Sequence, residues 1–325
     1  TLKFRTQDLQ TWGINFERKL RRLNEDSYWS PLPRIYDLHR VSMAGSLEDL
    51  RGLRPGRNLR IKPFASTASS TIGGNRTTGD FDAGIDAKYG VTNGLVWDFT
   101  VNTDFSQVEA DEQQINLTRF NLLFPEKRDF FLDNSGIFQF GTGGVGGAGQ
   151  ARPNQPGEMQ LFFSRRIGLS NDGEAIPLLA GTRLSGREGA YSLGVLNIQQ
   201  RHADGVPSTN FTAMRMRRNV LAQSDVGVMF LNKDAVGSHF NRIAGMDANF
   251  RFGYLNLNGQ MAKTFSPGQP TLRGRTLAGK ATVNYQGREW GWSGTANTIG
   301  AAFNDEVGYV PRHGINSLHA QFGRR

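Results

Sequence analysis

Apolar and polar residues alternate with a period of two along much of this chain. Phe81 to Tyr89 carries apolar side chains at its odd positions, and Leu95 to Val101 does the same after a short turn at Gly90 to Asn93. Successive side chains of a β-strand point to opposite faces, so each segment has one apolar and one polar face. The pattern predicts an antiparallel hairpin.

The same period returns throughout the second half of the chain. Alternating segments begin at Tyr191, Val226, Ala244, Leu255, Leu277, Trp290 and Leu318. Near the start, Trp12, Ile14 and Phe16 predict one more strand. Ser46 to Leu50 predicts a single capped helical turn, and no segment supports a longer helix. We therefore expect an all-β fold that forms one domain across residues 1–325.

Two architectures share this alternation. A soluble sandwich buries its apolar face, whereas a membrane barrel turns that face to lipid and lines its lumen with polar side chains. The segments resemble the ~9–11-residue strands of membrane barrels, and aromatic residues stand near their ends: Tyr89, Trp97, Tyr254, Tyr285 and Trp290. We favour an antiparallel transmembrane β-barrel, of which this chain can be a part.

The polar faces of the first strands supply the expected pore lining. These positions combine carboxylates, amines and amides, as a wet interior would. The set is Arg60, Lys62, Asp82, Asp86, Lys88, Asp98 and Asn102.

A long insertion, Asp104 to Glu158, interrupts the strand pattern. Ordinary connections have ~4–6 residues, so an insertion of this length is either functional or flexible. Its centre places the charged residues Glu126, Lys127, Arg128 and Asp129 beside Phe130, Phe131 and Phe138. We expect a plug-like loop that folds into the lumen. Its charges would pair with Lys62, Lys88, Asp82 or Asp98, and the alternative is a solvated surface loop.

Connection lengths support the barrel. Short connections (Arg187-Glu188, Gly253, Gly287-Arg288) alternate with long ones (Arg201 to Ser208, Thr264 to Arg273, Ile299 to His313), as turns and external loops of outer-membrane barrels do. When this alternation of short and long connections is extended back to the short turn at Gly90, the number of strands is off by one. Either Ile115 to Phe120 crosses the membrane or Gln160 to Phe163 does not.

Composition narrows the class further. The chain has no cysteine and a formal charge of +9, so a disulfide scaffold, a thiolate metal site and a cysteine nucleophile are excluded. Basic residues are spread along the chain except at Arg18 to Arg22 and Met214 to Arg218, which favours ordinary dispersed charges over a nucleic-acid site. Anchoring at a lipid headgroup surface would use such clusters equally well. The chain begins without an initiator Met or a signal peptide, which suggests a mature or excised piece.

Motifs for catalysis are weak. Gly141 to Gly146 fits a dinucleotide motif but no helix pattern follows it. The five histidines lack metal-ligand spacing, and Glu109, Asp111 and Glu112 are read as a solvated acidic loop rather than a calcium site. We expect no enzyme activity, no cofactor and no metal.

A resemblance to a known bacterial family runs through nearly the whole chain. It is carried by TWGINFERKLRRLNEDSYW, GLRPGRNLRIKPF, NTDFSQVEADEQQINLTRFNLLFPEKRDFFLDNSGIFQFG, LFFSRRIGL, IPLLAGTRLSG, YSLGVLN and FNDEVGYVPR. These segments resemble a family of unknown function whose members are expected to form outer-membrane barrels. Leu123 stands where an aromatic residue is usual, and Asp133 where Glu is. Members often carry a domain similar to family 9 carbohydrate-binding modules ahead of the barrel. The present sequence does not include that domain. The resemblance implies a barrel that continues beyond Arg325.

The functional expectation is a porin-like channel in the bacterial outer membrane, constricted by its internal loop and passing a small solute or a saccharide. One alternative is a non-conducting membrane anchor or assembly partner for envelope machinery, including a periplasmic carbohydrate-binding domain. The other is a soluble β-sheet protein that binds or hydrolyses carbohydrate.

Overall fold

The computed structural model describes residue 4 and residues 7–33, 37–53, 59–72, 76–102, 126, 128–141, 159–169, 176–203, 205–237, 239–269 and 275–324. The chain divides into two compact units, Thr1–Arg57 and Asn58–Arg325, whereas the sequence analysis treated residues 1–325 as one domain. Each unit is described by itself. The expected insertion, residues 104–158, falls within the second unit.

The first unit consists of two small antiparallel pairs. Strand β1 (Leu9–Ile14) pairs with β4 (Gly45–Arg51), and β2 (Glu17–Leu20) pairs with β3 (Glu25–Tyr28). A 3₁₀ turn, η1 (Val41–Met43), precedes β4.

The helical turn expected at Ser46 to Leu50 is therefore wrong. These residues belong to β4, where Leu47 lies opposite Trp12. Asp49 has a φ of 58°, a left-handed conformation that interrupts a right-handed helical turn.

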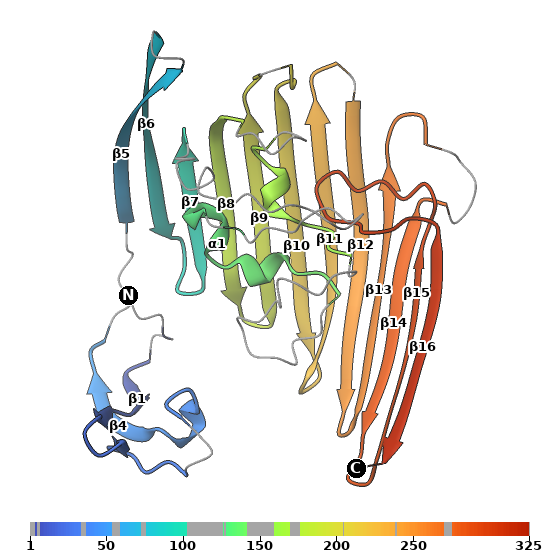
Figure 1. The fold of residues 1–325 in the computed structure, drawn as a ribbon. Helices are drawn as coiled ribbons and strands as arrows, with labels where there is room; N and C mark the ends of the chain where they lie inside the picture. Colours follow the sequence, from blue (N-terminus) through green and yellow to red (C-terminus); the bar gives the residue numbers. More distant parts are fainter. Residues whose placement is uncertain are drawn as a thin grey trace. The chain divides into compact units, whose positions relative to one another are not determined.

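The second unit is built on a single antiparallel sheet of 12 strands (Figure 1). Each strand pairs with its neighbours in sequence, so the order is β5 to β16 without a crossover. The strands are β5 (Leu59–Ile72), β6 (Arg76–Gly90), β7 (Leu95–Val101), β8 (Leu178–Glu188), β9 (Tyr191–Gln200), β10 (Thr209–Val220), β11 (Ser224–Ala235), β12 (His239–Phe252), β13 (Leu255–Phe265), β14 (Leu277–Gln286), β15 (Trp290–Ile299) and β16 (Ile315–Arg324). The all-β, antiparallel prediction is confirmed. The sheet is not closed into a barrel, because β5 and β16 stand at its two ends.

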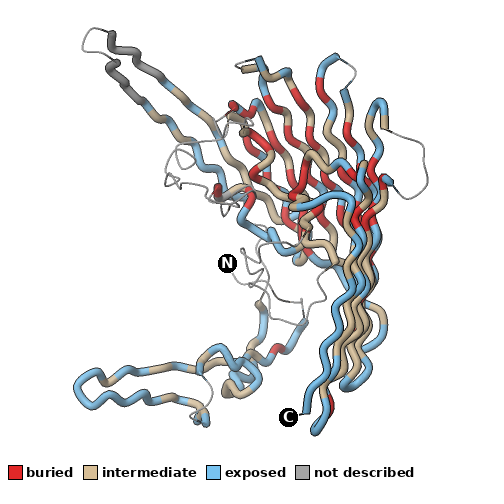
Figure 2. Tube along the Cα trace, turned by 45° about the vertical axis from the view of Figure 1, so that its right-hand side comes forward, coloured by how far each residue is buried: buried red, intermediate tan, exposed pale blue. Residues whose placement is uncertain are grey.

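The two faces of the sheet differ sharply in burial. In β10, Phe211, Ala213 and Arg215 are buried, whereas Met214 and Met216 between them are 45% and 46% exposed. Buried and exposed residues alternate in the same way along the neighbouring strands (Figure 2). We call the face with the buried side chains the inner face and the other the outer face.

All long connections leave the sheet at one end, which we call the long-connection end. They are residues 102–177, 201–208, 266–276 and 300–314, whereas the opposite end has only short turns such as 189–190 and 253–254. Strands β7 and β8 are direct neighbours, and Gln160 to Phe163 lies outside any strand. The count that was off by one strand is explained because Gln160 to Phe163 does not form a strand of the sheet. The other candidate, Ile115 to Phe120, lies outside the described residues.

Three segments from these connections lie across the inner face: residues 128–141, 159–169 and 300–310, which we call the cover segments (Figure 1). They contain the single helical turn α1 (Asp129–Leu132) and the 3₁₀ turns η2 (Ser135–Phe138) and η3 (Ser164–Arg166).

The hydrophobic core lies between the cover segments and the long-connection half of the sheet. From the cover segments come Phe131, Phe138, Leu161, Ile167, Phe303 and Val307, and from the sheet Leu178, Leu196, Ile198, Phe211, Ala213, Met229, Leu231, Ile243, Ala262, Ala278 and Ile299. The expectation of a polar inner face is therefore correct only for the half nearer the short turns. In the other half, the inner face is apolar and forms the core.

Candidate functional site

The candidate site is the inner face together with the cover segments. Local backbone bonds shape the first of these segments: the amides of Phe131 and Leu132 bond the carbonyl of Arg128 at 3.0 and 3.1 Å, and Asn134 then turns the chain with a φ of 54°. This turn separates α1 from η2 and lets Phe131 and Phe138 both reach the core.

Two glycines of the sheet make room for aromatic side chains of the cover segments. A Cβ atom at Gly194 would lie 2.9 Å from the ring of Phe138, and one at Gly245 would lie 2.8 Å from the ring of Phe140. Real Cβ contacts are essentially never this short. The close fit of cover segment to sheet therefore depends on glycine at both strand positions.

Arg128 is the polar centre of the cover. Its guanidinium bonds the carboxylate of Glu126 through Nε at 2.8 Å and Nη2 at 2.7 Å, and it also donates to the carbonyls of Ile167 at 2.8 Å and Ser164 at 3.0 Å. It stacks over the Phe131 ring at 4.1 Å. Burial opposes ionisation of Glu126, but the bonds and the charge of Arg128 outweigh it and lower the pKa of that carboxyl.

The sequence-based expectation was that Glu126 and Arg128 pin the insertion to charges on the sheet. The contacts named above join these two residues to the cover segment 159–169. Phe130 and Phe131 pack toward the core as expected. Lys127 and the side chain of Asp129 lie outside the described residues.

The bonds from cover to sheet are made by a neighbouring residue, Asp133. Its carboxylate pairs with Lys88 of β6, which also lies 3.3 Å from Asp98 of β7. Asp98 in turn accepts from Arg183 of β8 at 2.7 and 3.1 Å, and Arg183 donates to the carbonyl of Phe130. Burial opposes ionisation of Asp133, but Lys88 outweighs it and lowers the pKa of that carboxyl. The chain of charges ties α1 to three strands.

A second tie lies on β10 and β12. The buried pair of Arg215 and Asp247 is bonded twice, at 2.5 and 2.7 Å, and Asp247 also accepts from the backbone amide of Gly141 at 3.3 Å. Arg217 donates to the carbonyl of Gln139 at 3.3 Å. The basic cluster at Met214 to Arg218 thus sends two of its arginines to the inner face.

The register places the expected pore-lining residues on one face. Cross-strand pairs join Arg60 to Lys88 and Lys62 to Asp86, and Lys88 to Asp98. Members of a directly opposed pair share a face, so these residues line the inner face together.

Further bonds extend this row. Thr100 donates to Asp86 at 2.6 Å, and Asn102 donates to Asp82 and to the carbonyl of Ala83.

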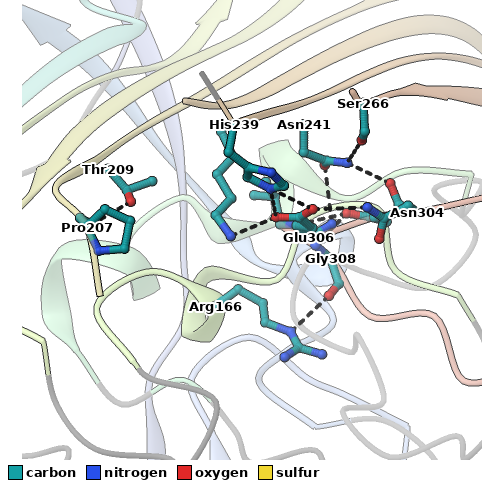
Figure 3. A network of polar contacts seen from close by, with 12 residues as sticks. Arg166, Pro207, Thr209, His239, Asn241, Ser266, Asn304, Glu306 and Gly308 are labelled. Atoms are coloured by element: carbon teal, nitrogen blue, oxygen red, sulfur yellow. Dashed lines mark hydrogen bonds and ion pairs between the residues drawn. The ribbon is translucent and has the colours of Figure 1, made fainter. Parts of the chain in front are cut away.

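A cluster that the sequence analysis missed fixes the last cover segment (Figure 3). The carboxylate of Glu306 accepts from Lys233 at 2.8 Å, from Asn304 at 3.0 Å and lies 3.1 Å from His239. Asn241 donates to the carbonyl of Asn304 at 2.8 Å. Burial opposes ionisation of Glu306, but Lys233 and His239 outweigh it and lower the pKa of that carboxyl.

The adjacent carboxyl behaves in the opposite way. Asp305 accepts from the amides of Val307 at 3.0 Å and Gly308 at 2.7 Å through Oδ1, while its buried Oδ2 has no partner among the described residues. Burial raises the pKa of Asp305 to about 8. Part of the residue remains exposed, so it is the buried oxygen rather than the whole side chain that carries this effect.

Next to Asp305 the cover segments pair through their backbones. Gln160 and Tyr309 exchange two hydrogen bonds at 2.9 and 2.7 Å, and Arg166 donates to the carbonyl of Gly308 at 3.2 Å (Figure 3). The sequence analysis named the segment FNDEVGYVPR only as part of the family resemblance. Nothing in the sequence marked it as a partner of Gln160.

Within the described ranges, no group of three or more His, Asp or Glu side chains is placed to hold a metal ion. No helix among those residues has the length and apolar character needed to cross a membrane.

Known proteins resemble this chain in two ways, through a family match and through a solved structure. Residues 55–197 match a family described as "Domain of unknown function (DUF5916)". The chain matches no curated protein. Among solved structures it is similar to the crystal structure of Pseudomonas aeruginosa OccK9 (OpdG), with 14% identity and a TM-score of 0.26 over 74% of this chain and 65% of that chain. The similarity thus spans just under two thirds of that chain's length.

Proposed function

We propose that this protein is a β-barrel of the bacterial outer membrane whose lumen is narrowed by the cover segments. The observation that carries the proposal is the two-faced sheet. Its outer face exposes large apolar side chains on nearly every strand while its inner face buries charged pairs. The exposed set includes Leu59, Ile61, Phe81, Ile85, Trp97, Phe99, Val195, Met214, Met216, Val228, Phe230, Met246, Met261, Trp290, Trp292, Leu318 and Phe322.

An apolar surface of this extent needs a partner. Water-soluble monomers rarely expose contiguous apolar patches beyond a few hundred Å², and the inner face already has its own cover. Outward apolar and inward polar side chains on neighbouring strands are the pattern of outer-membrane barrels. The extent of the apolar surface and the apolar-out, polar-in pattern both support lipid as the partner of the outer face.

The inner face supports a passage beside the cover. Its half nearer the short turns is polar and combines buried residues such as Asn249 with half-buried ones such as Asn258. Its amides and hydroxyls bond one another: Asn258 to Asn249 at 2.7 Å and Thr282 to Thr295 at 3.2 Å. Such a surface suits a small hydroxyl-rich solute, which exchanges hydrogen bonds readily. A saccharide is our preferred solute class, and we propose neither a catalytic step nor a nucleic-acid partner.

A specific observation favours the second candidate, a non-conducting anchor for an envelope partner. Phe131, Phe138, Leu161 and Phe303 are each at most 6% exposed, so the covered half of the inner face is packed like a protein core rather than wet. If the uncovered half is closed elsewhere, no current would flow. A periplasmic carbohydrate-binding domain is the partner expected in that case.

Single-channel conductance in planar bilayers separates the candidates. We expect a small current from the full chain and a larger one after deletion of residues 104–158, which removes the cover bonds to Lys88, Arg183 and Asp247. Shortening the β13–β14 connection by residues 270–274 is the matched control and should leave the current unchanged. Because the deletion also removes core side chains, its fold is checked by β-sheet circular dichroism. If neither the full chain nor the deletion variant passes a current although both are inserted in the bilayer, the non-conducting anchor is favoured.

A further inference from the structure

Polar side chains occupy a part of the outer face where apolar ones are expected. Near the long-connection end, two rows run straight across β9, β10 and β11, and the first continues to β12. The first row is Asn197, Thr212, Asn232 and Arg242, and the second is Gln199, Asn210 and Asp234. We call these residues the outer polar ladder. One step closer to the short turns the same face is apolar, with Val195, Met214, Phe230 and Ala244.

The ladder is ordered by its own hydrogen bonds. Asn197 donates to Asn210 at 2.9 Å and to Thr212 at 2.8 Å. Asn210 donates to Gln199 at 3.2 Å, and Gln199 donates to Ser208 at 2.9 Å. Fixed amides of this kind present donors and acceptors in set directions, which is how proteins recognise neighbouring hydroxyl groups.

A hollow of about 350 Å³ opens on the ladder. It is lined by Gln199, Ser208, Asn210, Asp234, Ala235 and Val236. Asp234 is exposed, and the structure shows no cation bonded to its carboxylate among the described residues. An unpaired carboxylate beside amides accepts hydrogen bonds from vicinal hydroxyl groups.

Two cations lie on the outer face of the next two strands, outside the lining of the hollow. Arg242 donates to Asn232 at 3.0 Å through Nε and stacks over Phe240 at 4.6 Å. Lys263 of β13, one row away, lies 5.1 Å from the ring of Phe265. Both cations are exposed on the outer face. The planar Nη groups of Arg242 suit a phosphate oxygen pair.

Strand length places the ladder at the membrane boundary. Strand β9 has 10 residues, which at ~3.3 Å each gives ~33 Å along the strand and ~23 Å across a bilayer at a ~45° tilt, close to the ~25 Å apolar band of such barrels. The end of the strand at Gln200 therefore marks one edge of the apolar band, so Gln199 lies at that edge and Asn197 lies ~5 Å further in. Long connections of outer-membrane barrels face outward, toward the leaflet that contains phosphorylated sugar lipids.

We propose that the outer polar ladder and the flanking Arg242 and Lys263 bind the phosphorylated sugar headgroup of a glycolipid in the surrounding leaflet. The ladder takes the sugar hydroxyls and the two cations take the phosphate, while acyl chains lie on the apolar rows beside Val195 and Met214. This inference rests on the proposed membrane location.

The test uses the full chain in phospholipid nanodiscs and a fluorescent, phosphorylated diglucosamine glycolipid as probe. The double variant Q199L/N210L is expected to weaken probe binding at least about tenfold. The control T298V/N316L alters another hydrogen-bonded, outward pair at the same end, 2.6 Å apart on β15 and β16, and should bind as the wild type does. R242Q should weaken binding of the phosphorylated probe and not of its dephosphorylated form.

Each other outcome would overturn the inference. Equal binding by Q199L/N210L and wild type would remove the ladder as the site, and equal competition by phosphatidylglycerol would reduce it to charge attraction. Equal binding of the deacylated headgroup would make the ligand a free saccharide, and a concentration-dependent dimer that excludes the probe would make the occupant a second copy.

A photoreactive headgroup keeps the inference testable if the double variant does not fold. With the wild type, cross-links are expected in residues 197–212 and 232–242, and cross-links confined to β14–β16 would contradict it. Quenching of the protein's tryptophan fluorescence by brominated phospholipid in the same nanodiscs separates this inference from the proposed membrane location. No quenching means that the membrane location fails, whereas quenching without preference for the glycolipid means that only this inference fails.

Discussion

Arg128 shows how one buried charge organises the cover. Its guanidinium holds Glu126, Ser164 and Ile167 in one place. Ser164 and Ile167 are 36 and 39 positions away in the sequence, and the Phe131 ring stacks on the same guanidinium. Buried ions persist only when paired and hydrogen-bonded. The contacts of Arg128 named above tie two cover segments to each other.

The first prediction concerns this tie. Arg128→Ala leaves the Glu126 carboxylate half-buried without its cation, and loss of one partner of a buried pair costs ~3–5 kcal/mol. We expect faster proteolysis within residues 126–141 and a lower unfolding temperature in detergent. Arg60→Ala, an exposed charge on the same face, is the control. Unchanged protease protection of the Arg128 variant would contradict the role given to it.

A second residue-scale prediction follows from Asp305, whose pKa is raised to about 8 by burial. A raised carboxyl pKa means that the folded chain binds the proton more tightly than the unfolded chain. Its contribution to stability is complete below the ordinary pKa of 3.8 and is lost as the pH rises through about 8. The charges facing it are those of Arg166 and Glu306.

Asp305→Asn removes this titration. Between pH 5 and pH 8 the free energy of unfolding of the wild type should fall by up to ~1.4 kcal/mol per pH unit relative to the variant, measured by urea unfolding of the detergent-solubilised protein. Parallel pH profiles for the two proteins would show that Asp305 ionises normally.

At this scale the sequence predicted which charges gather and not how they pair. Asp82, Asp86, Lys88 and Asp98 do share a face, because a period of two determines it. The partners of Arg128 could not be read, since Ser164 and Ile167 are distant in sequence and contribute backbone carbonyls, which carry no residue signature.

At the scale of elements, the cover is held by pairing between connections rather than by helices. The segment around Gln160 and the segment around Tyr309 exchange two backbone bonds, although about 150 residues separate them. Paired residues of this type have Cα atoms ~5.5 Å apart, a distance that a disulfide can span.

This pairing predicts a cross-link. The chain has no cysteine, so the variant Q160C/Y309C contains only the designed pair, and mild oxidation should join it in nearly all molecules. Mobility in gels before and after reduction measures the cross-link. The control Q160C/N316C places the second cysteine on the outer face and should stay reduced. A cross-link no faster in the first variant than in the control would contradict the contact.

The strands themselves were largely readable from alternation, and the hairpin of β6 and β7 is a direct example. The sequence failed where local patterns were ambiguous. Ser46 to Leu50 resembled a helix start but pairs with β1. Gly194 and Gly245, which no sequence pattern singled out, each admit an aromatic ring. Such close approaches depend on residues from another connection and leave no local signal.

For the whole molecule, the central question is which face of the sheet meets lipid. The alternation gave two faces, and the structure adds that the inner one is partly a packed core. Barrel closure could not be predicted, because it depends on whether the edges formed by β5 and β16 meet each other or other strands, and alternation carries no information about that.

The most direct test of the account uses the tryptophans. Trp97, Trp290 and Trp292 are 40–46% exposed on the outer face, and replacing Trp12 and Trp29 of the first unit by Phe leaves these three as the only tryptophans. The fluorescence of this variant in vesicles of brominated phospholipid should be strongly quenched, and aqueous acrylamide should quench it weakly. Strong quenching by acrylamide without an effect of brominated lipid would place the outer face in water and contradict the membrane barrel.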